Sequence, residues 1–104
     1  MVTGTVEIEV RLHACGSLKQ KRGVMKKAIA RIRSAFNVSA AETDLMDSRY
    51  SGCIGIAVVS NDRRRVNSLL DKICDFTENL HLFEVLHLRY RDTVTGASSG
   101  AKAG

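Results

Sequence analysis

The sequence lacks any apolar run long enough to cross a membrane, since no stretch approaches the ~18 residues that a transmembrane helix needs. Residues 1–15, where a secretory signal would carry an unbroken apolar segment, contain Glu7 and Glu9. We therefore expect a cytoplasmic protein without a membrane partner.

Cysteine and histidine are too few and too scattered for a disulfide framework or a metal site. No two cysteines have the C-x-x-C spacing, and their number is odd: Cys15, Cys53 and Cys74. This pattern indicates reduced thiols in a reducing compartment. His13 and Cys15 form one H-x-C pair, but His81 and His87 supply no second pair at ligand spacing. We expect no metal and no cofactor.

The composition is that of one ordinary globular domain, with 44% hydrophobic and 26% charged residues in a chain of 104. About 90 residues bury roughly 60–65% of their unfolded surface, which supports a core without disulfides. We assign residues 1–91 to this domain. Residues 92–104 are small and polar, and we predict that they form a disordered tail.

Hydrophobic periodicity predicts four strands and two helices. The predicted strands cover residues 2–12, 36–43, 53–60 and 83–91, with alternation clearest in the first and last. Ser17-Leu18-Lys19-Gln20 reads as a capping box that opens a helix over residues 18–36. Three possible N-caps at 60–62 precede a second amphipathic helix that ends near residue 79.

This order of elements predicts an α+β fold, a ferredoxin-like βαββαβ sandwich. Right-handed crossovers give a four-stranded antiparallel sheet in the order 4-1-3-2, with two helices on one face. The helices should run antiparallel. The C-terminal end of the first helix should then lie beside the start of the second.

Positive charge is concentrated in two segments rather than spread evenly. No acidic residue occurs between residues 18 and 36, a segment that contains Lys19, Lys21, Arg22, Lys26, Lys27, Arg31 and Arg33. Arg63, Arg64 and Arg65 form a second cluster, and the rest of the chain carries more acidic than basic residues. With antiparallel helices, we expect the two clusters to be neighbours.

An acid-free row of cations is typical of phosphate-backbone binding. The residues that we predict to bind nucleic acid or another anion are Lys19, Lys21, Arg22, Lys26, Arg31, Arg33, Arg63, Arg64 and Arg65. Four of them, Lys19, Arg22, Lys26 and Arg33, fall within roughly 60° of arc on one flank of the first helix. The alternative is a solvated helix face whose cations only confer solubility.

Two further features concern where an anion or a partner would bind. Gly16 and Ser17 enter a helix N-terminus and form a possible anion-binding turn; the alternative is a plain connection closed by its capping box. The open sheet face offers no aromatic residue on the first and third strands, so RNA would not stack there. Its uncharged strip of Gly55, Ala57 and Val59 is instead a possible homodimer surface.

Three ordered motifs resemble the YlxP-like family of bacterial domains of unknown function. They are residues 17–22 (SLKQKR), 36–40 (FNVSA) and 58–64 (VVSNDRR), and the resemblance spans roughly residues 1–91. The family usually has Glu at the position of Gln20 and a larger residue at Gly23. The resemblance implies a ferredoxin-like fold and genes that often lie near translation-initiation and ribosome-maturation genes. It implies no activity.

Three functional hypotheses follow. The first is a non-catalytic accessory protein that binds RNA or the ribosome through its basic helical surface. The second is a protein-interaction or homo-oligomer module whose basic row meets an acidic protein. The third is a phosphate-ester hydrolase: acylphosphatases share the fold and use an Arg and an Asn, and Arg11 and Asn61 are present, but the glycine-rich loop is missing.

Overall fold

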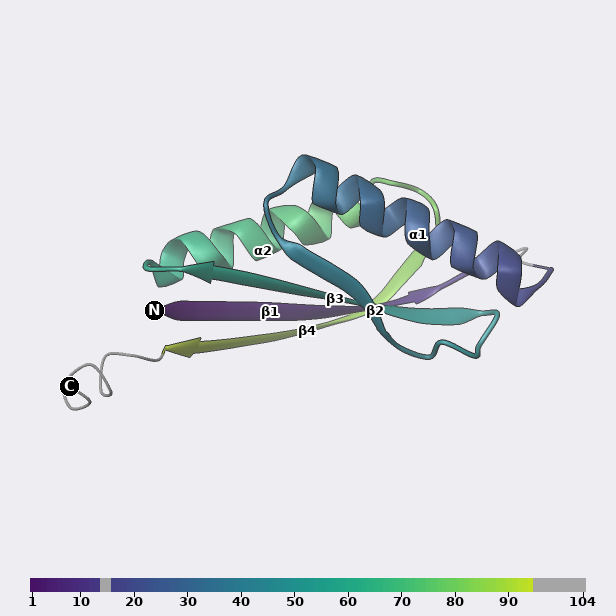
Figure 1. The fold of residues 1–104 in the computed structure, drawn as a ribbon, viewed down its shortest axis with the longest axis horizontal. Coiled ribbons are helices and arrows are strands. Elements are labelled where there is room, and N and C mark those ends of the chain that lie inside the picture. Colours follow the sequence, from purple (N-terminus) through teal and green to yellow (C-terminus); the bar gives the residue numbers. More distant parts are fainter. Residues whose placement is uncertain (14–15, 95–104) are drawn as a thin grey trace.

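A computed structural model describes residues 1–13 and 16–94 and has the predicted order of elements. These are β1 (Val2–Arg11), α1 (Leu18–Ala35), β2 (Ser39–Asp44), β3 (Ser51–Ser60), α2 (Arg63–Glu78) and β4 (Glu84–Val94). The sheet order is β2-β3-β1-β4, with every neighbouring pair antiparallel. Both helices lie on the same side of the sheet (Figure 1). The predicted fold class and strand order are confirmed.

The core lies between the sheet and the two helices because β1 and β3 each present one apolar face. Val6, Ile8 and Val10 of β1 are buried, whereas the residues between them are half-exposed on the other face. In β3 the same alternation buries Ile54, Ile56 and Val58. The helices supply the opposite layer with Met25, Ala28, Ile32, Val66, Leu70 and Ile73.

Two glycines in the sheet allow the helices to approach closely. A Cβ on Gly4 of β1 would overlap Val66 Cγ1 of α2 and lie 3.1 Å from Leu70 Cδ1. A Cβ on Gly52 of β3 would lie 2.7 Å from Met25 Cε of α1. Because glycine has no side chain, the strand backbone at these two positions lets each helix pack closer to the sheet.

The helices run antiparallel but are staggered, so the two basic clusters are not neighbours. α1 ends where its C-cap residue Phe36 packs edge-on against Phe76 of α2, with ring centroids 5.4 Å apart. Phe76 lies in the last turn of α2, roughly 16 Å along the helix axis from Arg65. The ends that meet are both C-terminal (Figure 1). The predicted adjacency of the two clusters is wrong, because each helix is shorter than the strand layer that it crosses.

All four strands differ from their predicted bounds, β1 and β3 by one or two residues at one end and β2 and β4 by three. β2 begins at Ser39 rather than at residue 36, because Phe36 still caps α1 through its N–H, which donates to the Ile32 carbonyl at 2.9 Å. β4 continues to Val94, so residues 92–94 of the predicted tail belong to the sheet. The remaining tail, residues 95–104, lies outside the described residues.

A register shift in β4 also changes which face Val85 occupies. The β1–β4 pairing is interrupted between Glu9 and Val10, so that Val85 pairs with the core residue Val10. Simple alternation would have placed Val85 on the same face as His87 and Arg89. The bulge turns Val85 toward the core.

The close packing at Gly4 gives a testable prediction. Gly4→Ala should lower the free energy of unfolding by about 1–3 kcal/mol, because the new methyl group meets Val66 and Leu70. Gly23→Ala is the control: Gly23 is exposed on α1 with nothing within 4 Å of the added atom. That substitution should stabilise the fold by about 0.5–1 kcal/mol. Urea unfolding of both variants measures the difference, and a stable Gly4→Ala variant would contradict the packing described here.

Candidate anion-binding surface

The N-terminus of α1 is closed by its own side chains. The N–H of Gln20 donates to Ser17 Oγ at 3.2 Å, and Gln20 Oε1 accepts from the N–H of Gly16. The predicted capping box is therefore present, although Gln20 reaches back to Gly16 rather than to Ser17. Both polar groups of the predicted anion-binding turn are thus engaged within the cap. Cys15, the neighbouring thiol, lies outside the described residues.

Lys21 is not available to an external anion, contrary to the sequence prediction. Its side chain is 0% exposed, and its ammonium donates to Glu42 Oε2 at 2.7 Å and to the Leu45 carbonyl at 2.8 Å. The reason is its position on the helix: Lys21 lies in the same buried stripe as Met25, Ala28 and Ile32. The ion pair ties α1 to β2.

Four of the predicted cations form an exposed row on α1, which we call the α1 flank: Lys19, Arg22, Lys26 and Arg33. The row extends for roughly 21 Å along the helix axis. Within the described residues, none of the four forms an ion pair. The α1 flank therefore retains its full positive charge at the surface.

The remaining cations of α1 lie on the side that faces α2. Lys27 and Arg31 line one hollow together with Phe76. By helical geometry this side is well separated from the α1 flank around the helix axis. Arg31, although predicted to act with the flank, lies on this second side, and neither it nor Lys27 has an ion-pair partner in the described chain.

The arginines at the start of α2 form a separate and partly neutralised cluster. Arg63 Nε lies 3.4 Å from Asp92 Oδ2 of β4. Asp62 caps the helix by accepting from the N–H of Arg64 at 2.9 Å. Arg64 and Arg65 are exposed and line a shallow hollow with Lys72. Because this cluster lies far from the end of α1, the predicted nine-residue site divides into separate groups.

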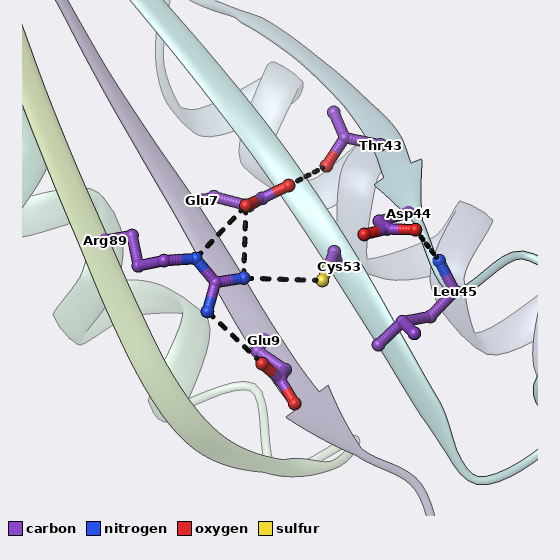
Figure 2. A network of polar contacts seen from close by, with 7 residues as sticks. All are labelled: Glu7, Glu9, Thr43, Asp44, Leu45, Cys53 and Arg89. Atoms are coloured by element: carbon purple, nitrogen blue, oxygen red, sulfur yellow. Dashed lines mark hydrogen bonds and ion pairs between the residues drawn. The ribbon is translucent and has the colours of Figure 1, made fainter.

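The open sheet face carries a network in which the positive charge is neutralised (Figure 2). Arg89 of β4 donates to Glu7 Oε1 at 3.1 Å and to Glu9 Oε1 at 3.3 Å. Thr43 Oγ1 of β2 donates to the other oxygen of Glu7 at 2.8 Å. These hydrogen bonds raise the pKa of Arg89. Two carboxylates therefore share the Arg89 guanidinium, whereas Arg91, which lines the same face, forms no ion pair within the described residues.

The thiol of Cys53 lies at the edge of this network, 3.9 Å from Arg89 Nη2. Burial raises the pKa of Cys53, and the carboxylates of Glu7 and Glu9 raise it further. A buried thiol with a raised pKa is a poor nucleophile. We assign Cys53 no chemical role.

Beside the network the open face is hollow, with a volume of about 780 Å³. Its floor consists of small residues, among them Ala41, Gly55 and Ala57, and Arg89 and Arg91 line one side. The strip that we predicted as a dimer surface thus forms part of a depression, apart from Val59, which is 66% exposed.

The two residues that suggested a phosphate hydrolase lie at opposite ends of the sheet. Arg11 pairs with Ser51 at one end of β3, whereas Asn61 directly follows Ser60 at the other. Their separation is roughly 30 Å along the strands, so they cannot act on one phosphate.

Within residues 1–13 and 16–94 no three potential metal ligands gather, and no helix there is long and apolar enough to cross a membrane.

Two features of the surface were not predicted, although the sequence contains a signal for each. Lys21 precedes Met25 by four residues and Ala28 by seven, which places it on the buried stripe. The strand order places the last strand beside β1, where Glu7 pairs with Arg89. The predicted strand order, with the last strand beside the first, already implies that Glu7 and Arg89 are cross-strand neighbours.

Comparisons with known proteins give a family and a fold but no activity. A family model described as "Protein of unknown function (DUF503)" matches residues 3–90. The chain is 34% identical over 76 residues to "Uncharacterized protein YlxP" of Bacillus subtilis (strain 168), covering 73% of this chain and 83% of that protein. Among solved structures, "De novo designed protein Foldit4" superposes with a TM-score of 0.50 at 14% identity, covering 90% of this chain and 97% of that one. The last likeness concerns the fold alone.

The buried ion pair predicts an asymmetric response to mutation. Glu42→Ala should destabilise the protein by about 3 kcal/mol, because it leaves the Lys21 ammonium buried with only the Leu45 carbonyl as partner. Lys21→Met should cost about 1 kcal/mol, since Glu42 is 19% exposed and can be hydrated. Urea unfolding of the two variants, with Glu42→Gln as the variant that keeps an acceptor, tests this order. Equal losses would show that the pair is not the tie between α1 and β2.

Proposed function

The chain belongs to the DUF503 family of proteins of unknown function, and we propose that it is a non-catalytic accessory protein that binds RNA or the ribosome through the α1 flank. One observation carries this proposal: the exposed cations of the flank have no carboxylate partner within the described chain. An ordinary helix surface mixes charges of both signs for i,i+4 pairing.

The distribution of acids supports binding on the helical side. Glu7, Glu9, Glu42 and Asp92 each contact a basic residue of their own chain. None of these contacts involves the α1 flank. A polyanion that meets this protein is therefore attracted to the α1 flank, whose cations form no ion pair within the described residues.

The shape of the flank favours contact with a phosphate backbone over reading of bases. Its cations lie on a convex helix surface, and their spacing of three, four and seven residues places them in one row. Lys and Arg in such a row neutralise phosphates without contacting base edges, so affinity should depend little on sequence. The chain resembles the YlxP-like family, whose genes often lie near translation-initiation and ribosome-maturation genes. This makes ribosomal RNA the first candidate.

An acidic protein is the second candidate, because its surface is negatively charged, as RNA is. The two differ in salt dependence: nucleic-acid binding releases counterions and gives a linear loss of log affinity with log salt. A protein interface gains much of its affinity from apolar contacts that salt does not weaken. The α1 flank has no exposed large apolar residue among its cations, which favours the nucleic acid.

Binding through the α1 flank should show a defined salt slope. If all four cations contact phosphates, the slope of log affinity against log salt should be about −3. Replacing Arg22, Lys26 and Arg33 together by Gln should reduce the slope to about −1 and weaken binding to ribosomal RNA at low salt. Fluorescence anisotropy with a labelled RNA fragment measures both quantities.

A matched triple variant on α2 separates the flank from net charge. Arg64→Gln, Arg65→Gln and Lys72→Gln remove the same charge from exposed positions on the other helix. This variant should retain most of the affinity and the slope. An equal loss in both triple variants, or the absence of RNA binding at low salt, would refute the proposal. Co-sedimentation with ribosomes from lysate at two salt concentrations then tests whether the ribosome is the target.

A further inference from the structure

The exposed cations of α1 form two rows on different sides of the helix. At 100° per residue, the α1 flank covers roughly 60° of arc on one side, and Lys27 and Arg31 cover roughly 40° on the other. We call Lys27 and Arg31 the second row. Both are exposed, and within the described residues neither the flank nor the second row forms an ion pair. The helix therefore presents uncompensated positive charge on both sides of its outward direction.

The space beside the second row is open to a partner. Lys27 and Arg31 line a hollow of about 510 Å³. Among the described residues, Phe76 is the one residue of α2 that lines this hollow. The cations of the second row are therefore not covered by the neighbouring helix, and a partner can approach them without moving it.

The outward side of α1, between the two rows, carries short side chains. Gly23, Ala30 and Ser34 lie there within roughly 40° of arc, and all three are exposed. A Cβ added to Gly23 would meet nothing within 4 Å, so the packing of the fold does not require a glycine at this position. The long side chains of the two rows therefore extend beyond the surface that lies between them.

The separation of the two rows matches two phosphate backbones better than one. An α-helix with its side chains is about 10–12 Å across, so charges on its two sides are separated by about this distance. A single strand that lies along α1 contacts one row and leaves the other in solvent. The two backbones that border a groove of a duplex can contact both rows at once, which neutralises all of these cations.

The short side chains between the rows favour a shallow groove. The major groove of B-DNA is about 8.5 Å deep, and proteins read it with long polar side chains that reach the base edges. Gly23, Ala30 and Ser34 do not have that reach. The major groove of an RNA duplex is deep and narrow, whereas its minor groove is wide and shallow and displays the 2′-hydroxyl groups. Ser34 supplies a hydroxyl that can bond to one of them.

We infer that α1 binds the minor groove of an RNA duplex, with the α1 flank on the phosphates of one strand and the second row on those of the other. This inference rests on the proposed function, because it names the form of RNA that the same helix binds. Recognition then depends on the shape of the duplex and little on its sequence.

The salt dependence of binding tests whether both rows contact RNA. Fluorescence anisotropy compares a labelled RNA duplex with one of its strands alone and with the DNA duplex of the same sequence. The RNA duplex should bind at least about tenfold more tightly than either, with a slope of log affinity against log salt of about −5. Replacing Lys27 and Arg31 by Gln should reduce this slope by about 2. Arg64→Gln with Lys72→Gln removes the same charge from exposed positions on α2 and should leave it unchanged.

A neutral substitution tests the close approach of the outward side. Ala30→Leu adds bulk without charge and should weaken binding to the RNA duplex at least about tenfold, because it holds both backbones away from the cations. The loss for the single strand should be smaller. Ser68→Leu adds a similar bulk to an exposed position on α2 and is the control. Urea unfolding of both variants shows whether the fold is intact.

The outcomes separate this inference from the proposed function. Equal affinity for duplex and single-stranded RNA, with a slope of about −3 that replacement of the second row does not change, would overturn the inference and leave binding through the α1 flank in place. Tighter binding of the DNA duplex, or an unchanged affinity of the Ala30→Leu variant for the RNA duplex, would also overturn it. If no RNA binds at low salt, both fail.

Discussion

The contact between the Lys21 ammonium and Glu42 fixes the rotation of α1 about its own axis. With 0% exposure and two hydrogen-bond acceptors, Lys21 can be satisfied only when this side of the helix faces β2. Within residues 1–13 and 16–94, the remaining cations of α1 form no ion pair. The buried pair thus decides which part of the helix faces solvent, and with it the charge of the surface.

Charge is separated between the two layers of this fold. Four acids of the sheet, Glu7, Glu9, Glu42 and Asp92, meet basic residues of β4, α1 or α2, whereas the α1 flank forms no ion pair within the described residues. These four carboxylates thus have basic partners within the chain, whereas the cations of the α1 flank have no such acidic partner in its described part. A fold with both helices on one face of the sheet allows this separation, because the outer side of each helix faces solvent and not a strand.

The fold could be predicted from the sequence because its signals are local. The alternation in β1 and the contact between Ser17 and Gln20 depend on neighbours a few residues away. The errors concern the stagger of the helices, a bulge in the β1–β4 pairing and the burial of Lys21. The stagger of the helices depends on strand length and on where Phe36 meets Phe76, and the face of Val85 depends on a bulge that periodicity does not reveal. Helical periodicity thus predicted which cations of α1 share one exposed row, but not how that row lies relative to the arginines that open α2.

Because the two helix C-termini lie together, the electric potential differs between the two ends of the α1 flank. Each helix carries a partial negative charge of roughly half an electron at its C-terminal end, and these two ends converge near Phe36 and Phe76. They partly offset the charge of Arg33, the basic residue in the last turn of α1. At the opposite end, the partial positive charge of the α1 N-terminus adds to Lys19 and Arg22. The electric potential therefore rises from one end of the helix to the other, and an extended anion would be held more strongly at its Lys19 end.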